Sequence, residues 1–302
     1  MNAGWQLNKL MCQVGHRIWL RGYCAGHEGD HSLRLGDDRL LCTPAAASVG
    51  FLEPQQVCLV DMEGKPVEPN PTGCQPTGEL GLHLAIYRHR PNVKAIIHSH
   101  PPHATAFAVA NVPIPEGIHP QAELCLGKVP IARYATPSSA ALADSVTQLV
   151  GPQTNTVILG NHGTVSFSDQ GLLDAYAKLE IVDAYCRILL LAVPLGRVKT
   201  LSDHQLMDLL TAKQQMGQPD DRLACADDGC IGQDNEPYLA ALDARPVTAT
   251  CGCNGGPVQT TCTEPGQPQS AAPSHARFES LVRTITDQIV GNAGTSRPQE
   301  SR

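Results

Sequence analysis

The chain has 302 residues, 42% of them hydrophobic and only 4% aromatic, which is enough for one large domain with a mostly aliphatic core. The net charge of −7, from 22 Lys and Arg against 29 Asp and Glu, argues against a nucleic-acid partner, which would need a basic face. The sequence shows neither a signal peptide nor an apolar run that could cross a bilayer, so we expect a cytoplasmic protein with no membrane partner.

Apolar spacing predicts a first helix over residues 5–22, with Gly22 as its stop. Thr77 is placed to cap a later helix. The predicted elements that follow are strands at 39–43 and 57–61, a helix at 79–89, a strand at 95–98, a helix at 138–149, a strand at 156–159 and a helix at 170–192. Short strands and helices without a strict βαβ rhythm predict an α/β domain, over residues 1–215, on a partly antiparallel sheet.

The composition changes after residue 215. Residues 216–275 are rich in Gly, Pro, Gln and Cys and lack apolar periodicity, which predicts a disordered linker. Five of the 12 cysteines lie there, and their spacing matches no familiar metal-binding motif, which favours an unstructured, redox-sensitive segment; a zinc or iron–sulfur site is the alternative. Residues 276–291 again place their apolar side chains on one stripe, which predicts a short amphipathic C-terminal helix.

A histidine pair stands at the end of a predicted strand. His98 and His100 would point to the same face of that strand, where two imidazoles can chelate one metal ion. Catalytic zinc usually takes three protein ligands, and His162, in the N-H-G segment after another strand, is the best third candidate. His103 is the rival. An incidental polar pair at a strand end is the alternative for the H-x-H motif alone.

The segment T-G-E-L-G-L-H-L-A-I-Y-R-H-R-P-N-V-K-A-I-I-H-S-H-P-P-H, together with L-G-N-H-G-T-V, resembles the core signature of the class II aldolase/adducin family. The resemblance covers about residues 5–200. It implies a three-layer domain whose central mixed, largely antiparallel sheet is flanked by helices. It also implies one Zn2+ per subunit on His98, His100 and His162, a homotetramer, and Glu79 as the acid/base residue that aldolases carry at that position.

The same resemblance implies a substrate-binding or phosphate-binding set made of Ser32, Thr43, Thr77 and Gly78. The family's G-N-x-S-x-R turn reads G-D-H-S-L-R at residues 29–34, so Asp30 replaces a neutral donor with a carboxylate that only accepts hydrogen bonds. The tyrosine that aldolases carry after the I-H pair is missing. Glu123 is a candidate to serve there, and a surface or interface charge is the equal alternative.

The resemblance implies a zinc-dependent aldolase that cleaves a deoxyketose 1-phosphate, such as L-fuculose or L-rhamnulose 1-phosphate, to dihydroxyacetone phosphate and lactaldehyde. A zinc ion would stabilise the enediolate, and Glu79 would transfer the proton. The alternatives are a sugar-phosphate epimerase of the L-ribulose-5-phosphate type, a decarboxylase, and a non-catalytic adducin-like interaction module. The three histidines weigh against the last.

The C-terminal stripe resembles the encapsulation peptides of bacterial microcompartment enzymes. Those peptides are short amphipathic helices after Pro/Gly-rich linkers, and residues 276–291 share that arrangement. The resemblance implies a shell or cargo protein as a partner and a place inside such a compartment. Docking of the helix on its own domain or on a neighbouring subunit is the alternative.

Overall fold

The computed structural model describes residues 3–195, 198–224, 235 and 238. The residues from 239 onward, with the predicted helix at 276–291 and most of the predicted linker, lie outside this part of the chain. No helix in the described part is both long and apolar enough to span a membrane.

A seven-stranded mixed sheet forms the centre of the domain, in the order β3-β2-β1-β4-β7-β6-β5. Every neighbouring pair is antiparallel except β5 and β6, which are parallel. The strands are β1 (Asp30–Leu35), β2 (Arg39–Cys42), β3 (Cys58–Asp61), β4 (Ala95–Ser99), β5 (Ile131–Ala132), β6 (Thr156–Leu159) and β7 (Gly163–Ser168).

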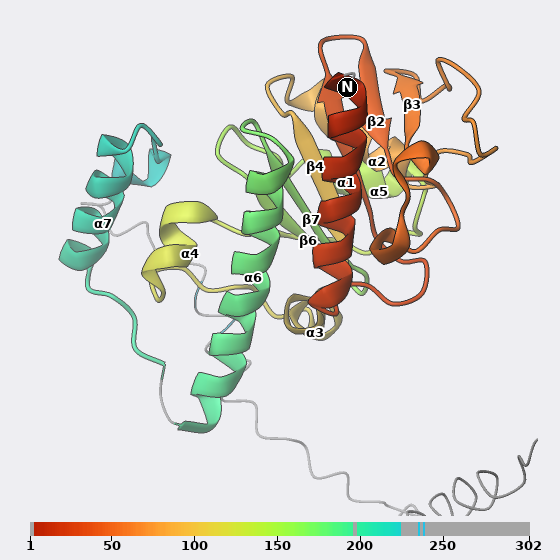
Figure 1. Ribbon diagram of the computed structural model, residues 1–302. Coiled ribbons are helices and arrows are strands. Elements are labelled where there is room, and N and C mark those ends of the chain that lie inside the picture. Colours follow the sequence, from red (N-terminus) through yellow and green to blue (C-terminus); the bar gives the residue numbers. More distant parts are fainter. Residues whose placement is uncertain (1–2, 196–197, 225–234, 236–237, 239–302) are drawn as a thin grey trace, which may run out of the picture. The chain divides into compact units, whose positions relative to one another are not determined.

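Helices cover both faces of this sheet (Figure 1). Helices α1 (Ala3–Leu20) and α6 (Leu172–Ala192) pack on one face, against Leu33, Ala95 and Ile97. Helices α2 (Leu80–His89) and α5 (Ala140–Thr147) pack on the other face, where Ile96 contributes to the core. Neighbouring residues of β4 therefore enter opposite cores, as the alternation of side chains along a strand requires. The predicted three-layer fold class is confirmed.

The remaining helices lie beside these layers. They are α3 (Pro102–Ala110), α4 (Pro120–Cys125) and α7 (Asp203–Gln215), with short 3-10 turns at Val49–Phe51, Pro54–Gln56, Val193–Leu195 and Asp221–Ala224.

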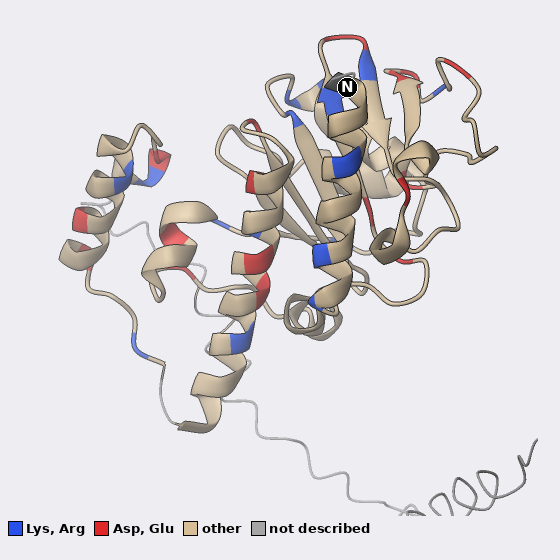
Figure 2. Ribbon diagram, in the orientation of Figure 1, with Lys and Arg blue, Asp and Glu red and all other residues tan. Residues whose placement is uncertain are grey.

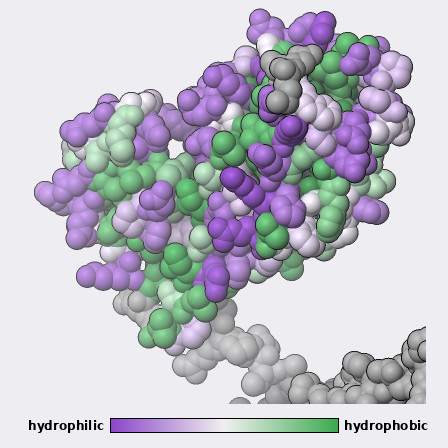
Figure 3. Space-filling view, viewed as in Figure 1, coloured by the Kyte–Doolittle hydropathy of each residue, from purple (hydrophilic) through white to green (hydrophobic). Residues whose placement is uncertain are grey.

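Figure 2 shows basic residues along α1 and acidic residues along α6, and Arg21 and Glu180 form an ion pair of 2.7 Å. Figure 3 shows hydrophobic surface near the end of α6. Leu191 of α6 and Leu195 of the following 3-10 turn are exposed.

The segment that resembles a phosphate-binding turn is mostly a strand. Gly29, at φ +74°, makes the turn, and residues 30–35 then form β1 in the middle of the sheet. Polar Asp30 and Ser32 face the side of the sheet that α2 covers, while Leu33 enters the core under α1. Because the α2-facing side of β1 is polar, hydrophobicity alone did not predict this strand.

The chain beyond α7 folds back on the domain. The Asp220 carboxylate is buried and lies 2.9 Å from Lys213 Nζ, and Arg222 Nη1 lies 2.8 Å from Glu116 and 2.7 Å from Glu123. Composition predicts that the linker begins at residue 216, but these ion pairs attach the chain to α7 and α4 through residue 222. The part of the predicted linker at residues 220–222 is therefore bonded to the domain.

Candidate metal centre

Three histidine side chains meet beyond the end of β4. His98 is the fourth residue of β4, His100 follows that strand, and His162 lies in the tight turn between β6 and β7. Their ring centroids are 4.7 to 5.0 Å apart. One potential ligand atom from each ring lies within 4.8 Å of the others. Among the described residues, these three histidines are therefore the group whose ligand atoms could hold one metal ion. His103 is not part of it, because its Nδ1 bonds to Asp183 at 2.9 Å.

A hydrogen bond to His98 and a charged contact with His100 indicate which nitrogen of each ring faces the cluster. Nδ1–H of His98 donates to the carbonyl oxygen of Thr164 at 2.9 Å, and Nδ1 of His100 lies 3.2 Å from the Glu28 carboxylate. The Thr164 oxygen only accepts, so Nε2 of His98 keeps its lone pair, and the Glu28 carboxylate favours the same tautomer in His100. Those two Nε2 atoms are 3.2 Å apart.

This separation fits a shared cation. Two nitrogens held at about 2.05 Å by one tetrahedral zinc ion lie roughly 3.3 Å apart. Two lone pairs that face each other at 3.2 Å repel unless a cation lies between them. In addition, Nδ1 of His162 and Oε2 of Glu79 are buried and have no hydrogen-bond partner in the described structure. The residues present therefore fit a divalent metal ion.

Burial keeps the imidazoles of His98 and His162 neutral, which is the form that binds metals. It lowers the pKa of His98 to about 4 and that of His162 to about 4, and the positive charge of neighbouring rings adds to the effect. Near pH 7 both side chains are therefore unprotonated, and a bound cation would keep its full charge.

Close packing of the histidine turn requires Gly163. A Cβ at this position would lie 2.4 Å from Cδ2 of His100 and 2.6 Å from the carbonyl oxygen of Ser99. Asn161, two residues earlier, adopts the left-handed conformation at φ +54°. The N-H-G sequence thus brings the β6–β7 turn against the end of β4, and this contact places His162 beside His98.

Glu79 lies beside the cluster. It is the residue before α2, and its carboxylate oxygens are 3.5 Å from Nε2 of His98 and 3.8 Å from Nε2 of His162. Burial raises the pKa of Glu79, and the nearby Asp30 carboxylate raises it further. A carboxyl group with a raised pKa beside a metal site is suited to general acid/base catalysis.

The other predicted contact residues fall into two groups. Ser32 and Thr43 are fully buried, with the Ser32 hydroxyl 2.7 Å from Nδ1 of His83 and the Thr43 hydroxyl accepting from the backbone N–H of His31 at 3.1 Å. Thr77 and Gly78 directly precede Glu79, and Gly78 is exposed. Thr77 and Gly78 therefore adjoin Glu79 in the chain, and Thr77 bonds to Asp30, whereas Ser32 and Thr43 bond inside the protein.

Asp30 has a buried partner that sequence reasoning missed. Its Oδ1 lies 2.9 Å from Nε2 of His83, and the antiparallel register places Asp30 opposite His98. Burial alone would raise the pKa of Asp30, but His83, His98 and the Thr77 hydroxyl together hold it well below its usual value. Asp30 is therefore a carboxylate within the wall of the site.

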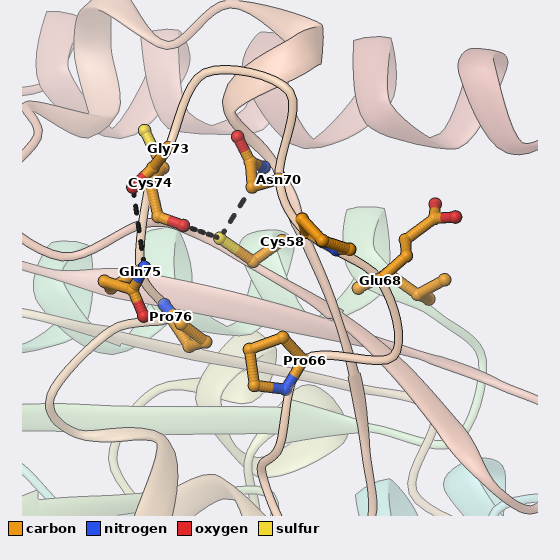
Figure 4. Close-up of a pocket in the computed structure, with 10 residues that line it drawn as sticks. Cys58, Pro66, Glu68, Asn70, Gly73, Cys74, Gln75 and Pro76 are labelled. Atoms are coloured by element: carbon orange, nitrogen blue, oxygen red, sulfur yellow. Dashed lines mark hydrogen bonds between the residues drawn. The ribbon is translucent and has the colours of Figure 1, made fainter.

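Glu123 lies away from the histidines. Its side chain is 2% exposed, accepts from the backbone N–H of Gly117 at 2.6 Å and pairs with Arg222. It is neither a surface charge nor a member of the site. A cavity of about 130 Å³ around Cys58, Cys74 and Pro76 is also separate from the cluster (Figure 4).

The mixed three-layer domain and the three-histidine cluster define an α/β protein with a candidate metal centre. The family model for the class II aldolase and adducin N-terminal domain matches residues 9–190, and the chain belongs to this family. It is therefore an enzyme of the metal-dependent lyase type.

Individual relatives divide between two reactions. An L-fuculose phosphate aldolase of Methanococcus vannielii is 32% identical over 180 residues, which is 60% of this chain and 93% of the relative. A 3-oxo-tetronate 4-phosphate decarboxylase of Haemophilus influenzae is 31% identical over 207 residues, 67% of this chain and 94% of the relative.

Among solved structures, YgbL of Klebsiella pneumoniae matches with a TM-score of 0.62 and 29% identity. That protein is described as an aldolase, epimerase or decarboxylase. The match covers 69% of this chain and 100% of that one. An L-fuculose 1-phosphate aldolase matches with a TM-score of 0.63 at 23% identity, which supports the fold alone.

Proposed function

We propose that this chain binds one zinc ion through His98, His100 and His162 and cleaves the bond between the α and β carbons of a β-hydroxy carbonyl compound by a retro-aldol reaction. The observation that carries the proposal is the cluster itself. Two imidazoles whose lone pairs point inward and a third beside them are flanked by a carboxyl group with a raised pKa.

The residues of the site divide the chemistry between them. A bound zinc ion would act as a Lewis acid on the carbonyl oxygen, where negative charge develops as the bond breaks. Glu28 and the Thr164 carbonyl orient the His100 and His98 rings. In the cleavage direction the β-hydroxyl group loses its proton as the aldehyde forms, and the α carbon gains one. Glu79, at 3.5 Å from His98, delivers the proton to that α carbon.

The substrate that we propose is a deoxyketose of the L-fuculose or L-rhamnulose kind. The relatives named L-fuculose phosphate aldolase favour it. Cleavage would release lactaldehyde together with dihydroxyacetone or its phosphate. The bond that breaks is the same whether or not the ketose carries a phosphate at carbon 1, so the reaction type does not depend on that group.

Decarboxylation is the second candidate. It leaves an electron pair next to a carbonyl in the same way as a retro-aldol cleavage, so the same metal and acid/base residues would serve. The relative named as a decarboxylase covers more of this chain, 67%, than the aldolase relative at 60%. A 4-epimerase would cleave the same bond and rejoin it, and therefore release no product fragment.

Product analysis with and without a chelator tests the proposal. Purified protein should contain about one metal ion per chain, and turnover of L-fuculose and L-rhamnulose, free or as 1-phosphates, should release lactaldehyde until EDTA is added. Release of CO2 from a 3-oxo acid without aldehyde would select the decarboxylase. Protein that holds no metal and whose activity survives EDTA would contradict the proposal.

Two further proposals concern assembly. We propose a homotetramer, on the basis of the family alone. We also propose that residues 276–291, outside the described residues, bind a shell or cargo protein of a bacterial microcompartment. Sequestration of a reactive aldehyde product would give that targeting a chemical purpose.

A further inference from the structure

Two cysteines stand directly opposite each other on neighbouring strands, outside the candidate metal centre. Cys42 is the last residue of β2 and Cys58 is the first residue of β3, and the antiparallel register pairs these two residues. Side chains of directly opposed residues lie on the same face of a sheet, in contact distance of each other. Both cysteines belong to the core between the sheet and α2, where Cys42 is fully buried and Cys58 is 3% exposed.

The backbone spacing of this pair suits a disulfide. Opposed residues of antiparallel strands have Cα atoms about 4.5 or 5.5 Å apart, depending on whether the pair is hydrogen-bonded, and a disulfide spans about 4.4 to 6.8 Å. In addition, β3 is the edge strand of the sheet, with β2 as its neighbour, so a small shift of β3 disturbs one strand pairing. A bond between the two sulfur atoms therefore needs no rearrangement of the sheet.

Cys58 also lines the cavity of about 130 Å³ that contains Cys74. Figure 4 shows the Cys58 sulfur between Asn70 and Cys74, at 3.9 Å from Nδ2 of Asn70 and 3.8 Å from the carbonyl oxygen of Cys74. Gly73 and Gln75 in the cavity wall are exposed, so the cavity adjoins the solvent. A water molecule occupies about 30 Å³ in the liquid, so the cavity has room for hydrogen peroxide but not for a bulky oxidant such as oxidised glutathione.

The surroundings of Cys58 favour the thiolate, which is the form of cysteine that attacks oxidants. A hydrogen bond from Cys42 lowers the pKa of Cys58 and outweighs the opposing effect of burial, and the same bond raises the pKa of Cys42. The amide of Asn70 is a further donor toward the Cys58 sulfur. Cys58 is therefore the better nucleophile of the pair. Burial instead raises the pKa of four other cysteines in the described part of the chain, Cys12, Cys24, Cys125 and Cys186.

We propose that Cys58 is a site of oxidation by hydrogen peroxide and other small hydroperoxides, and that Cys42 then closes a disulfide between β2 and β3. The inference is independent of the proposed lyase function, because neither the metal ion nor the substrate of that reaction takes part. A dithiol reductant reverses the modification by thiol–disulfide exchange, as it does for the transient disulfides of redox-sensing proteins.

The oxidation proceeds in two steps that balance. First, the Cys58 thiolate attacks the terminal oxygen of the hydroperoxide, so that an S–O bond forms and the O–O bond breaks. Cys58 becomes a sulfenic acid, and the alkoxide or hydroxide that leaves takes up the proton that the thiol released. Second, the Cys42 sulfur attacks the Cys58 sulfur, so that the S–S bond forms, the S–O bond breaks and hydroxide leaves as water with the Cys42 proton. The two sulfur atoms together lose two electrons, and the two oxygen atoms of the hydroperoxide gain them.

Oxidation of the reduced, full-length wild-type protein tests the proposal. The protein is treated with hydrogen peroxide, the remaining thiols are alkylated, and the digested peptides are analysed by mass spectrometry. We expect a cross-linked pair of peptides that contains Cys42 and Cys58 and has lost two hydrogen atoms, while buried Cys186 stays reduced and dithiothreitol restores both free thiols. The proposal is overturned if Cys42 and Cys58 both stay reduced, or if Cys58 forms its disulfide with Cys74.

Variants assign the two roles. Cys42→Ser leaves Cys58 without a second thiol, so peroxide should produce a sulfenic acid at Cys58 that dimedone traps. In Cys58→Ser the Cys42 thiol should stay reduced. Dimedone on Cys42 in Cys58→Ser, or none on Cys58 in a folded Cys42→Ser protein, would contradict the assignment, and the wild-type experiment does not require either variant to fold.

Two controls address the other thiols of the chain. Cys125→Ser removes a half-buried thiol of α4 and should form the disulfide in wild-type yield. A chain in which the five cysteines after residue 224 are replaced by serine should do the same. Loss of the disulfide in that chain would show that those thiols carry the oxidation, and would overturn the role of Cys58.

Discussion

Replacing Gly163 with alanine should displace His100 and weaken metal binding. The added Cβ would lie 2.4 Å from Cδ2 of His100, whereas carbon atoms in contact are comfortable at about 3.5 to 4.0 Å. The ring must therefore move by about 1 Å, away from its 3.2 Å separation from His98. Displacement of this size in a ligand should lower metal affinity roughly 10- to 100-fold, as changes in ligand-orienting residues do.

The same substitution should also destabilise the fold. The new Cβ meets the backbone oxygen of Ser99 at 2.6 Å, and Ser99 is paired with Thr164 between β4 and β7, so it has little freedom to retreat. Overpacking of this kind costs about 1 to 3 kcal/mol. Urea unfolding of the metal-free protein measures this cost separately from the metal affinity, which competition with a chromophoric chelator gives.

Gly81→Ala is the matched control. Gly81 lies in α2, and no atom comes within 4 Å of a Cβ built there, so alanine should leave metal binding unchanged and stabilise the helix by up to about 1 kcal/mol. If Gly163→Ala folds and binds metal with wild-type affinity, then His100 is not a ligand held by this packing, and the reasoning for the centre is wrong.

The remaining predictions concern the ligands, the acid/base residue, pH and the tail. His162→Ala should lose stoichiometric metal by elemental analysis, and EDTA should lower the Tm of the wild-type protein but not of this variant, since a ligand stabilises only the form that binds it. Glu79→Gln should retain metal yet lose about 10²- to 10⁴-fold in kcat, and full activity would exclude it as the acid/base. Lys213 and Arg222 hold the pKa of buried Asp220 at about 2 against the cost of its burial. Because the pKa of Asp220 is lower in the folded state, its ionised form stabilises the fold fully above about pH 4, and this stabilisation is lost as the pH falls toward 2. Asp220→Asn should therefore lower the free energy of unfolding by about 2 kcal/mol at pH 7 and by little at pH 2, as urea titrations would measure. Deletion of residues 276–302 should leave activity intact and abolish co-localisation with shell protein, and unchanged targeting would refute the encapsulation role.

Hydrophobic spacing predicted the helices and strands that have one clear apolar stripe or run. Helices α1, α2, α5 and α6 and strands β2, β3, β4 and β6 all lie within a few residues of their predicted positions. Helix α3 was missed because its small apolar residues leave no polar face, and α4 because six residues span less than two turns.

The site was predictable where it depends on local pattern and unpredictable where it depends on register. His98, His100 and His162 each stand in a short motif at the end of a predicted strand. Glu28 had no such signal, because its contact with His100 follows from β1 pairing with β4, with Asp30 opposite His98, and β1 was not predicted. The Asp30–His83 pair likewise joins a strand to a helix 53 residues later in the chain.

The ion pairs around Arg222 determine where a shortened version of this protein can end. A fragment that stops at residue 215 would keep every histidine of the candidate centre, yet Glu116 and Glu123 would be left enclosed without their guanidinium partner. Removing one side of a buried charge pair costs about 3 to 5 kcal/mol, a large share of the roughly 5 to 15 kcal/mol that keeps a typical domain folded. Expression clones should therefore extend past residue 224. A fragment that stops at residue 215, where the composition changes, would give insoluble material in which catalysis could not be measured.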